Sequence, residues 1–141
     1  MSTQEKTTLT VQSIINAPIE KVWESWNNPE DIKNWCAASD DWHAPKAEND
    51  LKEGGRFSTR MEAKDGSMGF DFGGTYTTVK KNEAIEYTMD DDRKVKIRFT
   101  PDGDTTQVVE SFEAEDTHPI EMQQGGWQAI LDNFKKYTEG K

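Results

Sequence analysis

The sequence predicts an α+β fold, in which a curved antiparallel sheet is covered by one long helix near the C-terminus. Two observations carry this prediction. Between about residues 42 and 115, apolar and polar residues alternate with a period of two, which is typical of strands with one wet and one covered face. Before and after that stretch, apolar residues recur at helical spacing. The 141 residues contain no long linker, so we expect a single domain over residues 1–141.

The N-terminal part predicts one strand followed by two short helices. The stretch "TTLTVQSIINA" (residues 7–17) alternates like a strand. The stretch "NAPIEKVWESWNN" then predicts a helix with Pro18 in its first position and with Asn16 or Ala17 as its cap. The stretch "PEDIKNWC" predicts a second helix, capped by Asn28.

The alternating middle of the chain predicts a meander of strands. The amphipathic runs are residues 55–63, 68–79, 83–89, 94–100 and 105–114. Asp65-Gly66 predicts a hairpin turn between the first two of these runs. The stretch "PDGD" predicts the turn before the last run, because proline fixes one dihedral angle and glycine accepts a positive one.

The last part, residues 119–138, predicts the long closing helix, and it contains the unusual pair Gly125-Gly126. Each glycine inside a helix costs roughly 1 kcal/mol relative to alanine. The pair would permit a kink, or a close approach of the helix to the sheet or to a bound molecule. Gly73-Gly74, inside a predicted strand, would allow a bend or a close approach as well. The alternative for both pairs is packing and curvature alone.

Composition and charge exclude several classes of protein. The net charge of −10 disfavours nucleic acid and anionic membrane surfaces as partners. The chain has no uncharged apolar run long enough to be inserted into a membrane, and its first residues, "MSTQEKTTLT", lack the layout of a signal peptide. Its single cysteine, Cys36, excludes an internal disulfide framework. We therefore expect a cytoplasmic protein.

The sequence offers no assignable catalytic or metal site. Cys36 lies toward the end of a predicted helix, where nothing favours its thiolate, so we expect a buried or idle thiol. His43 and His118 lie far apart and outside any metal-binding spacing. No nucleophile elbow or phosphate-binding loop is present. We expect no cofactor and no metal, and the catalytic residues, if there are any, are unknown.

Three stretches together resemble a known family. They are "INAPIEKVWESWNNPEDIKNW", the glycines of "GGRF" and "FGGTY", and "GGWQAILDNFKKY". They are similar to the homologues of the activator of the heat-shock chaperone ATPase (AHSA-like), in the START-related helix-grip (SRPBCC) superfamily. The resemblance spans about residues 8–138. It implies a helix-grip fold: six or seven antiparallel strands wrapped around the C-terminal helix, with two small helices after the first strand.

The resemblance also implies a site, because members of this superfamily commonly hold apolar or amphipathic small molecules between sheet and helix. Whether Glu110 is part of the lining depends on the face of the last strand. It points inward if Val108 and Phe112 do, and outward if Val109 and Ser111 form the buried face. Gln123 and Gln124 would lie at the mouth. The expected ligand-binding residues are Trp35, Met61, Phe72, Tyr76, Tyr87, Met89, Phe99, Glu110, Gln124, Trp127, Ile130 and Phe134.

Three functions are compatible with these observations. The first is a binding protein for a hydrophobic or amphipathic small molecule, acting as a monomer or homodimer. The second is an interaction protein that stimulates a chaperone ATPase, as the eukaryotic namesake of the family does. The third is a cyclase or hydrolase acting on an aromatic substrate, which would require a strongly perturbed acid or base in the cavity. We rank them in this order and expect a protein that is not an enzyme.

Overall fold

The computed structural model describes residues 7–37, 39–115 and 118–141. The expectation about a signal peptide falls mostly on residues 1–6 and lies outside these ranges. The described part forms seven strands and three helices, which confirms the α+β helix-grip prediction. Their bounds are β1 Thr8–Ile15, α1 Ile19–Asn27, α2 Pro29–Trp35, β2 Trp42–Asn49, β3 Arg56–Ala63, β4 Gly69–Lys80, β5 Ala84–Met89, β6 Lys94–Asp102, β7 Thr105–Glu113 and α3 Ile120–Glu139.

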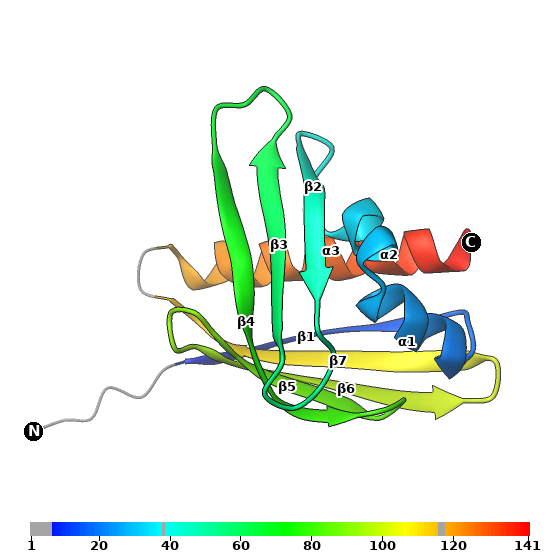
Figure 1. The fold of residues 1–141 in the computed structure, drawn as a ribbon. Helices are drawn as coiled ribbons and strands as arrows, with labels where there is room; N and C mark the ends of the chain where they lie inside the picture. Colours follow the sequence, from blue (N-terminus) through cyan, green and yellow to red (C-terminus); the bar gives the residue numbers. More distant parts are fainter. Residues whose placement is uncertain (1–6, 38, 116–117) are drawn as a thin grey trace, which may run out of the picture.

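The sheet is antiparallel throughout and has the order β1-β7-β6-β5-β4-β3-β2. Figure 1 shows that β2, β3 and β4 rise at a steep angle from the other four strands. Helix α3 lies in the angle between these two parts, and α1 and α2 sit beside its C-terminal half. The sheet therefore forms a trough, and the long helix runs along it.

Close backbone approach at Gly73 and Gly74 accompanies the bend of the sheet. A Cβ atom on Gly73 would lie 2.8 Å from the Phe57 carbonyl oxygen, and one on Gly74 would lie 2.5 Å from the Thr88 carbonyl oxygen. The register between β4 and β5 also shifts just beyond this point, between Tyr76 and Thr78. The predicted role of this glycine pair in a close approach is confirmed.

The second glycine pair, Gly125-Gly126, does not have one of the roles predicted for it. A Cβ atom on Gly125 or Gly126 would meet nothing within 4 Å, and α3 runs without interruption from Ile120 to Glu139. These glycines therefore do not bring the helix close to the sheet, and that interpretation is wrong. They leave open space beside the first half of α3.

The open space at Gly125 predicts that alanine at this position would stabilise the protein. Because glycine costs roughly 1 kcal/mol relative to alanine inside a helix, Gly125→Ala should raise the free energy of unfolding by about 0.5–1 kcal/mol. Urea denaturation of the variant and the wild type measures this difference. Gly74→Ala is the matched control: its methyl group would collide with the Thr88 carbonyl, so it should destabilise by about 1–3 kcal/mol. Equal effects of the two substitutions would contradict the packing described here.

Two local details depart from the sequence expectations. Pro18 occupies the cap position of α1 instead of the first helical position, and no side chain caps this helix. The Asn28 side chain does cap α2, as predicted, by accepting a hydrogen bond of 3.0 Å from the Glu30 backbone N–H. Strand β2 had no expected bounds of its own, and it contains Pro45. Proline is tolerated there because β2 is an edge strand, with a register shift between His43 and Lys46.

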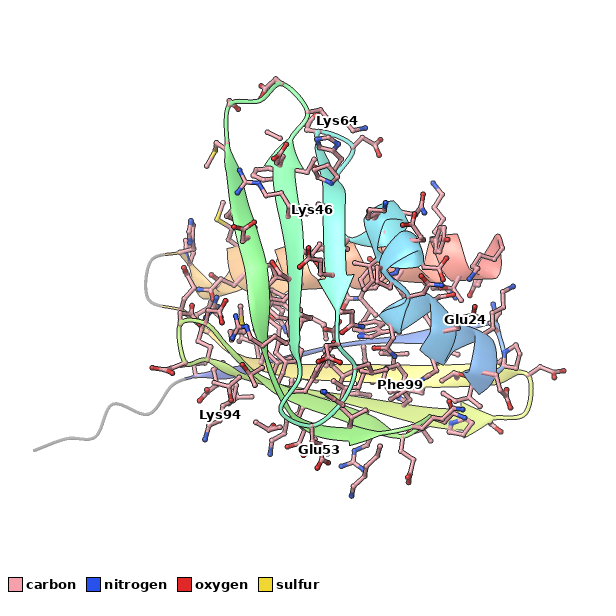
Figure 2. All side chains as sticks on the ribbon, in the orientation of Figure 1. Glu24, Lys46, Glu53, Lys64, Lys94 and Phe99 are labelled. Atoms are coloured by element: carbon pink, nitrogen blue, oxygen red, sulfur yellow. The ribbon has the colours of Figure 1, made fainter. Side chains whose placement is uncertain are left out.

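The core fills the trough, and the charged residues cover the outside. Figure 2 shows Lys94 projecting away from the sheet, whereas Phe99, which is buried, points inward. Within the described ranges, none of the helices combines the length and apolarity needed to cross a membrane. The large side chains that are fully buried are Phe112, Phe134, Ile15, Ile85, Ile97, Leu131, Val22, Val95 and Val108.

Candidate ligand-binding cavity

A cavity of about 280 Å³ lies between the bent sheet and α3. Its walls come from both halves of the trough and from all three helices. Most of the lining is aromatic or aliphatic, with a few polar side chains among them. The lining residues are Trp26, Ile32, Trp35, Cys36, Phe57, Thr59, Met61, Phe70, Phe72, Tyr76, Ile85, Tyr87, Met89, Arg93, Glu110, Glu115, Gln123, Trp127 and Ile130.

Aromatic side chains that hold one another in place form the sheet side of this cavity. The Phe57 ring lies 5.6 Å from Phe72, 5.2 Å from Tyr76 and 4.7 Å from Tyr87, measured between ring centroids. On the helix side, Trp127 presents its edge to Phe72 at 6.0 Å. Such pairs stabilise beyond the area they bury, so the walls are preformed.

Trp127 is fixed from behind by the last strand. Its ring stacks on Phe112 with centroids 4.0 Å apart and an interplanar angle of 9°. Phe112 is fully buried and shares the inner face of β7 with Val108. This stack joins the first half of α3 to the sheet, and it places Trp127 in the cavity wall.

Glu110 is the buried carboxyl group of the cavity. Val108 and Phe112 are fully buried and Glu110 is only 5% exposed, so the inward alternative for β7 holds. Its neighbours across the ladder are the apolar Val11 and Ile97. Burial raises the pKa of Glu110 from 4.5 to about 8, so this group is largely protonated at neutral pH.

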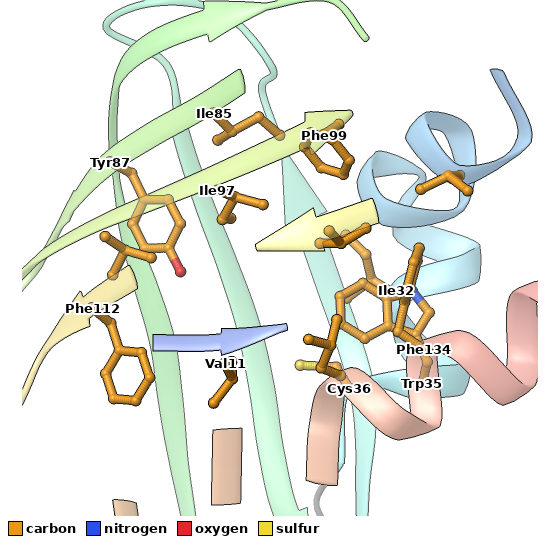
Figure 3. Close-up of a cluster of buried hydrophobic side chains, with 14 of the residues drawn as sticks. Val11, Ile32, Trp35, Cys36, Ile85, Tyr87, Ile97, Phe99, Phe112 and Phe134 are labelled. Carbon is orange, nitrogen blue, oxygen red and sulfur yellow. The ribbon is translucent and has the colours of Figure 1, made fainter. Parts of the chain in front are cut away.

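Cys36 and Tyr87 also face the cavity, and both remain neutral. Burial, with a smaller contribution from nearby Glu110, raises the pKa of the Cys36 thiol to about 12. Burial and then Glu110 raise the pKa of Tyr87 well above its usual value. Figure 3 shows both side chains within the buried cluster. The expected inert thiol agrees with these surroundings, which disfavour a thiolate.

Phe70 and Glu115, which are partly exposed, mark the end of the cavity that is nearest to solvent, close to the buried Gln123 at the start of α3. The Gln123 side chain accepts a hydrogen bond from the Glu115 backbone N–H at 2.8 Å and donates to the carbonyl oxygens of Glu115 and His118. Arg93 lies in the same region, and its Nε donates to Asp91 Oδ2 at 2.7 Å. Both polar side chains are therefore already engaged by the protein.

The structure brings most of the predicted site residues together. Gln123, which was expected at the mouth, also lies in the wall. As contacts to a ligand, all of them remain predictions. The members of the expected set that line the cavity are Trp35, Met61, Phe72, Tyr76, Tyr87, Met89, Glu110, Trp127 and Ile130.

Three predicted lining residues lie elsewhere, and these placements correct the expectation. Phe99 is buried near α1, with its ring 5.3 Å from Trp23. Phe134 is fully buried under the two short helices. Gln124 is exposed and donates a hydrogen bond of 3.0 Å to the Thr10 carbonyl oxygen. Helical spacing favoured Gln123 over Gln124, because Gln123 lies four residues before Trp127 and seven before Ile130 and so shares their face.

Sequence reasoning missed other lining residues, of which Phe57 is the most central. Phe57 and Thr59 share the inward face of β3 with the predicted Met61, so the alternation of "GRFSTRM" contained the signal. Trp26 and Ile32 line the closed end from α1 and α2. Of these two helices, the sequence placed only Trp35 of α2 in the cavity, and nothing in the sequence pointed to a contribution from α1.

Among the residues that the structure describes, no three His, Cys, Asp or Glu side chains come together in a way that could hold a metal ion. His43 lies 3.9 Å from Glu62, and His118 lies 2.9 Å from Glu115, both in exposed positions.

Comparison with known proteins identifies the family. The family model described as "Activator of Hsp90 ATPase homolog 1-like protein" matches residues 16–139, which is most of the chain. The chain belongs to this family. The match includes the two short helices, six of the seven strands and α3, and it agrees with the resemblance of the quoted motifs.

Solved structures support the same family assignment. An AHSA1-like protein from Aeromonas hydrophila is 46% identical, with a TM-score of 0.89 over 95% of this chain and 93% of that one. A protein from Cytophaga hutchinsonii is 60% identical, with a TM-score of 0.82 over 94% and 92%. A protein from Chromobacterium violaceum, 24% identical with a TM-score of 0.84 over 94% and 98%, shares the fold. No curated protein matches the chain significantly.

Proposed function

We propose that this AHSA1-like protein binds an apolar or amphipathic small molecule in the cavity between its sheet and α3. The observation that carries the proposal is a preformed aromatic cavity of about 280 Å³ inside a domain of only 141 residues. Protein interiors are normally close-packed, so space left among buried side chains such as Met61, Tyr76 and Tyr87 favours a binding role. An apolar cavity of about 150 Å³ is already large enough to hold benzene.

The lining matches what a small-molecule site requires. Ligand pockets are mostly apolar, with a few polar groups that fix orientation. Here the aromatic wall centred on Phe57 would supply the apolar contact, and Glu110 would supply a polar one. Partly exposed Glu115 and Phe70 belong to the same lining, which gives a ligand a route to the interior.

A fluorescent probe tests this function. N-phenylnaphthylamine is uncharged at neutral pH and fluoresces more strongly in apolar surroundings. The wild type should bind it saturably with one site per chain. Thr59→Phe should weaken that binding at least roughly tenfold, because the buried Thr59 lines the cavity and the added ring would fill it.

Thr77→Phe is the matched control, because it introduces the same ring on the exposed face of β4. It should leave probe binding unchanged. Overpacking at Thr59 costs about 1–3 kcal/mol, so circular dichroism must first show that the variant is folded. Probe binding that is absent in the wild type, or equal in the two variants, would contradict a binding role for the cavity.

The family description favours a second candidate function, which is stimulation of a chaperone ATPase. The net charge of −10 would make such a complex sensitive to salt. Mixing the protein with an Hsp90-type chaperone at low ionic strength should then increase ATP hydrolysis. The enzymatic alternative has Glu110 in its favour, as a buried acid with a perturbed pKa.

Localisation and assembly belong to the same proposal. A single cysteine, buried at the end of α2, supports our placing of the protein in the reducing cytoplasm. We propose a monomer or homodimer without nucleic acid, membrane insertion or cofactor. Native mass spectrometry of the purified protein would report the subunit number and any retained small molecule together.

A further inference from the structure

We propose that the ligand is an amphipathic amine, whose protonated nitrogen binds the Glu110 carboxylate while its apolar body lies against the aromatic wall. This inference rests on the proposed function and names the ligand class of the same cavity. Four features carry it: an unsatisfied buried carboxyl group, the charges that face the cavity, the aromatic faces around it, and the acidity of the whole chain.

The first feature is the missing partner of Glu110. Buried polar side chains nearly always make hydrogen bonds. Among the described residues, no side chain or backbone group forms a hydrogen bond with the Glu110 carboxyl group, and its oxygens are not enclosed by protein but open to the cavity. By contrast, the Tyr76 hydroxyl donates to Asn49 Oδ1 at 2.6 Å, and the Gln123 amide is engaged on both sides. Of these three polar side chains, Glu110 is therefore the one whose hydrogen-bonding capacity is left for a ligand.

The second feature is the charge distribution around Glu110. Val11 on β1 and Ile97 on β6 flank it, while β3 contributes Thr59 and Met61, and α3 contributes Trp127 and Ile130. Among the described residues, the titratable groups that interact with it are the neutral Cys36 and Tyr87, and the neutral Tyr76 lines the same cavity.

At the partly exposed end of the cavity, Arg93 forms an ion pair with Asp91 at 2.7 Å, and Glu115 pairs with His118. Arg93 is the single basic residue among the described lining residues, and it is not free to receive a ligand. An anionic ligand would thus enter an apolar interior next to a carboxyl group, whereas a cation would find a counter-charge there.

The third and fourth features also favour a cation. Ring faces of Phe, Tyr and Trp attract ammonium groups, and the lining contains Phe57, Phe72, Tyr87 and Trp127. The net charge of −10 raises the local concentration of cations around the protein. The acidity of the chain also disfavours a carboxylate ligand.

The protonation of Glu110 predicts how the affinity for an amine changes with pH. Glu110 must lose its proton to pair with an ammonium group, and its pKa is raised to about 8 by burial. An aliphatic amine stays protonated up to about pH 10. The affinity for such an amine should therefore increase about tenfold per pH unit as the pH rises toward 8, and then level off. Binding below pH 8 should release about one proton per ligand.

Isothermal titration calorimetry with three naphthalene derivatives tests the proposal. Naphthylmethylamine carries the ammonium group, naphthalenemethanol is its neutral counterpart, and naphthoate is the anion. We expect the wild type to bind the amine roughly ten- to a hundredfold tighter than the alcohol at pH 8, and naphthoate the most weakly. Glu110→Gln should abolish the preference for the amine over the alcohol. Glu48→Gln removes the same charge from an exposed site on β2 and should leave that preference unchanged.

Several outcomes would overturn the amine assignment. These are equal affinity for amine and alcohol, tighter binding of naphthoate, an unchanged preference in Glu110→Gln, and amine affinity that falls as the pH rises from 6 to 8. In each of these cases, binding of the alcohol would leave the cavity with its proposed binding function. If N-phenylnaphthylamine and all three derivatives fail to bind, the proposed function itself is contradicted, and the amine assignment with it.

Discussion

Replacing the buried acid, Glu110→Gln, is expected to stabilise this protein at pH 8 and to have little effect at pH 4.5. The reason is the unfavourable burial of a carboxylate in the apolar cavity wall. Glutamine has nearly the same shape and carries no charge at any pH. The difference in unfolding free energy between variant and wild type therefore isolates the titration of this one side chain.

The direction follows from the two pKa values of Glu110. Between the usual value of 4.5 and the folded value of about 8, the folded state holds a proton that the unfolded state has released. The wild type then loses about 1.4 kcal/mol of stability for each pH unit. The loss begins near pH 4.5, is complete near pH 8, and amounts to at most about 5 kcal/mol. The stabilisation by Glu110→Gln should grow over the same window.

Urea denaturation at pH 4.5, 6 and 8 would measure this difference. Glu48→Gln is the matched control, because it removes an exposed carboxylate from β2, and it should shift the unfolding free energy by less than about 0.5 kcal/mol at every pH. A difference between Glu110→Gln and the wild type that does not change with pH would show that Glu110 titrates normally. The cavity wall would then be more hydrated than its apolar lining indicates.

Phe134→Ala should be the most destabilising single truncation in the aromatic cluster, with a loss of about 3–5 kcal/mol. Phe134 is fully buried and joins all three helices. Its ring meets Trp26 of α1 edge-on, with centroids 4.7 Å apart, and Trp35 of α2 in the same way at 5.0 Å. The truncation would leave a cavity where α3 holds the two short helices against the sheet.

Thermal or urea unfolding measures the loss. Phe134→Leu keeps most of the volume and should cost clearly less than the alanine variant. Lys136→Ala, an exposed substitution two residues further along α3, should change stability by less than about 0.5 kcal/mol. A Phe134→Ala variant as stable as the wild type would mean that α1 and α2 do not depend on α3 for their position.

Much of the fold could be read from local patterns. The period of two predicted the strands of the meander, and the spacing of Trp127, Ile130 and Leu131 predicted α3. Asn28 predicted the start of α2 because its cap is a local interaction within two residues. The patterns did less well where neighbours decide the structure, as at Pro45, which the edge position of β2 accommodates.

The candidate site was only partly predictable for the same reason. The alternation along β3 and β4 showed which residues share a face, so Met61, Phe72 and Tyr76 were found. It could not show how far along the trough the cavity extends. Phe99 therefore fell in the packed region next to α1 instead of the cavity wall.

Local order along the chain was enough to specify the succession of strands and helices, the two hairpin turns and the amphipathic faces, because these depend on residues close in sequence. The family motifs added how these elements are arranged. Only the folded chain decided which face of β7 carries Glu110 inward, that Gly125 and Gly126 border open space, and that Phe134 closes the core. These features depend on residues brought together from distant parts of the chain, and their burial and raised pKa values arise only when the sheet bends around α3.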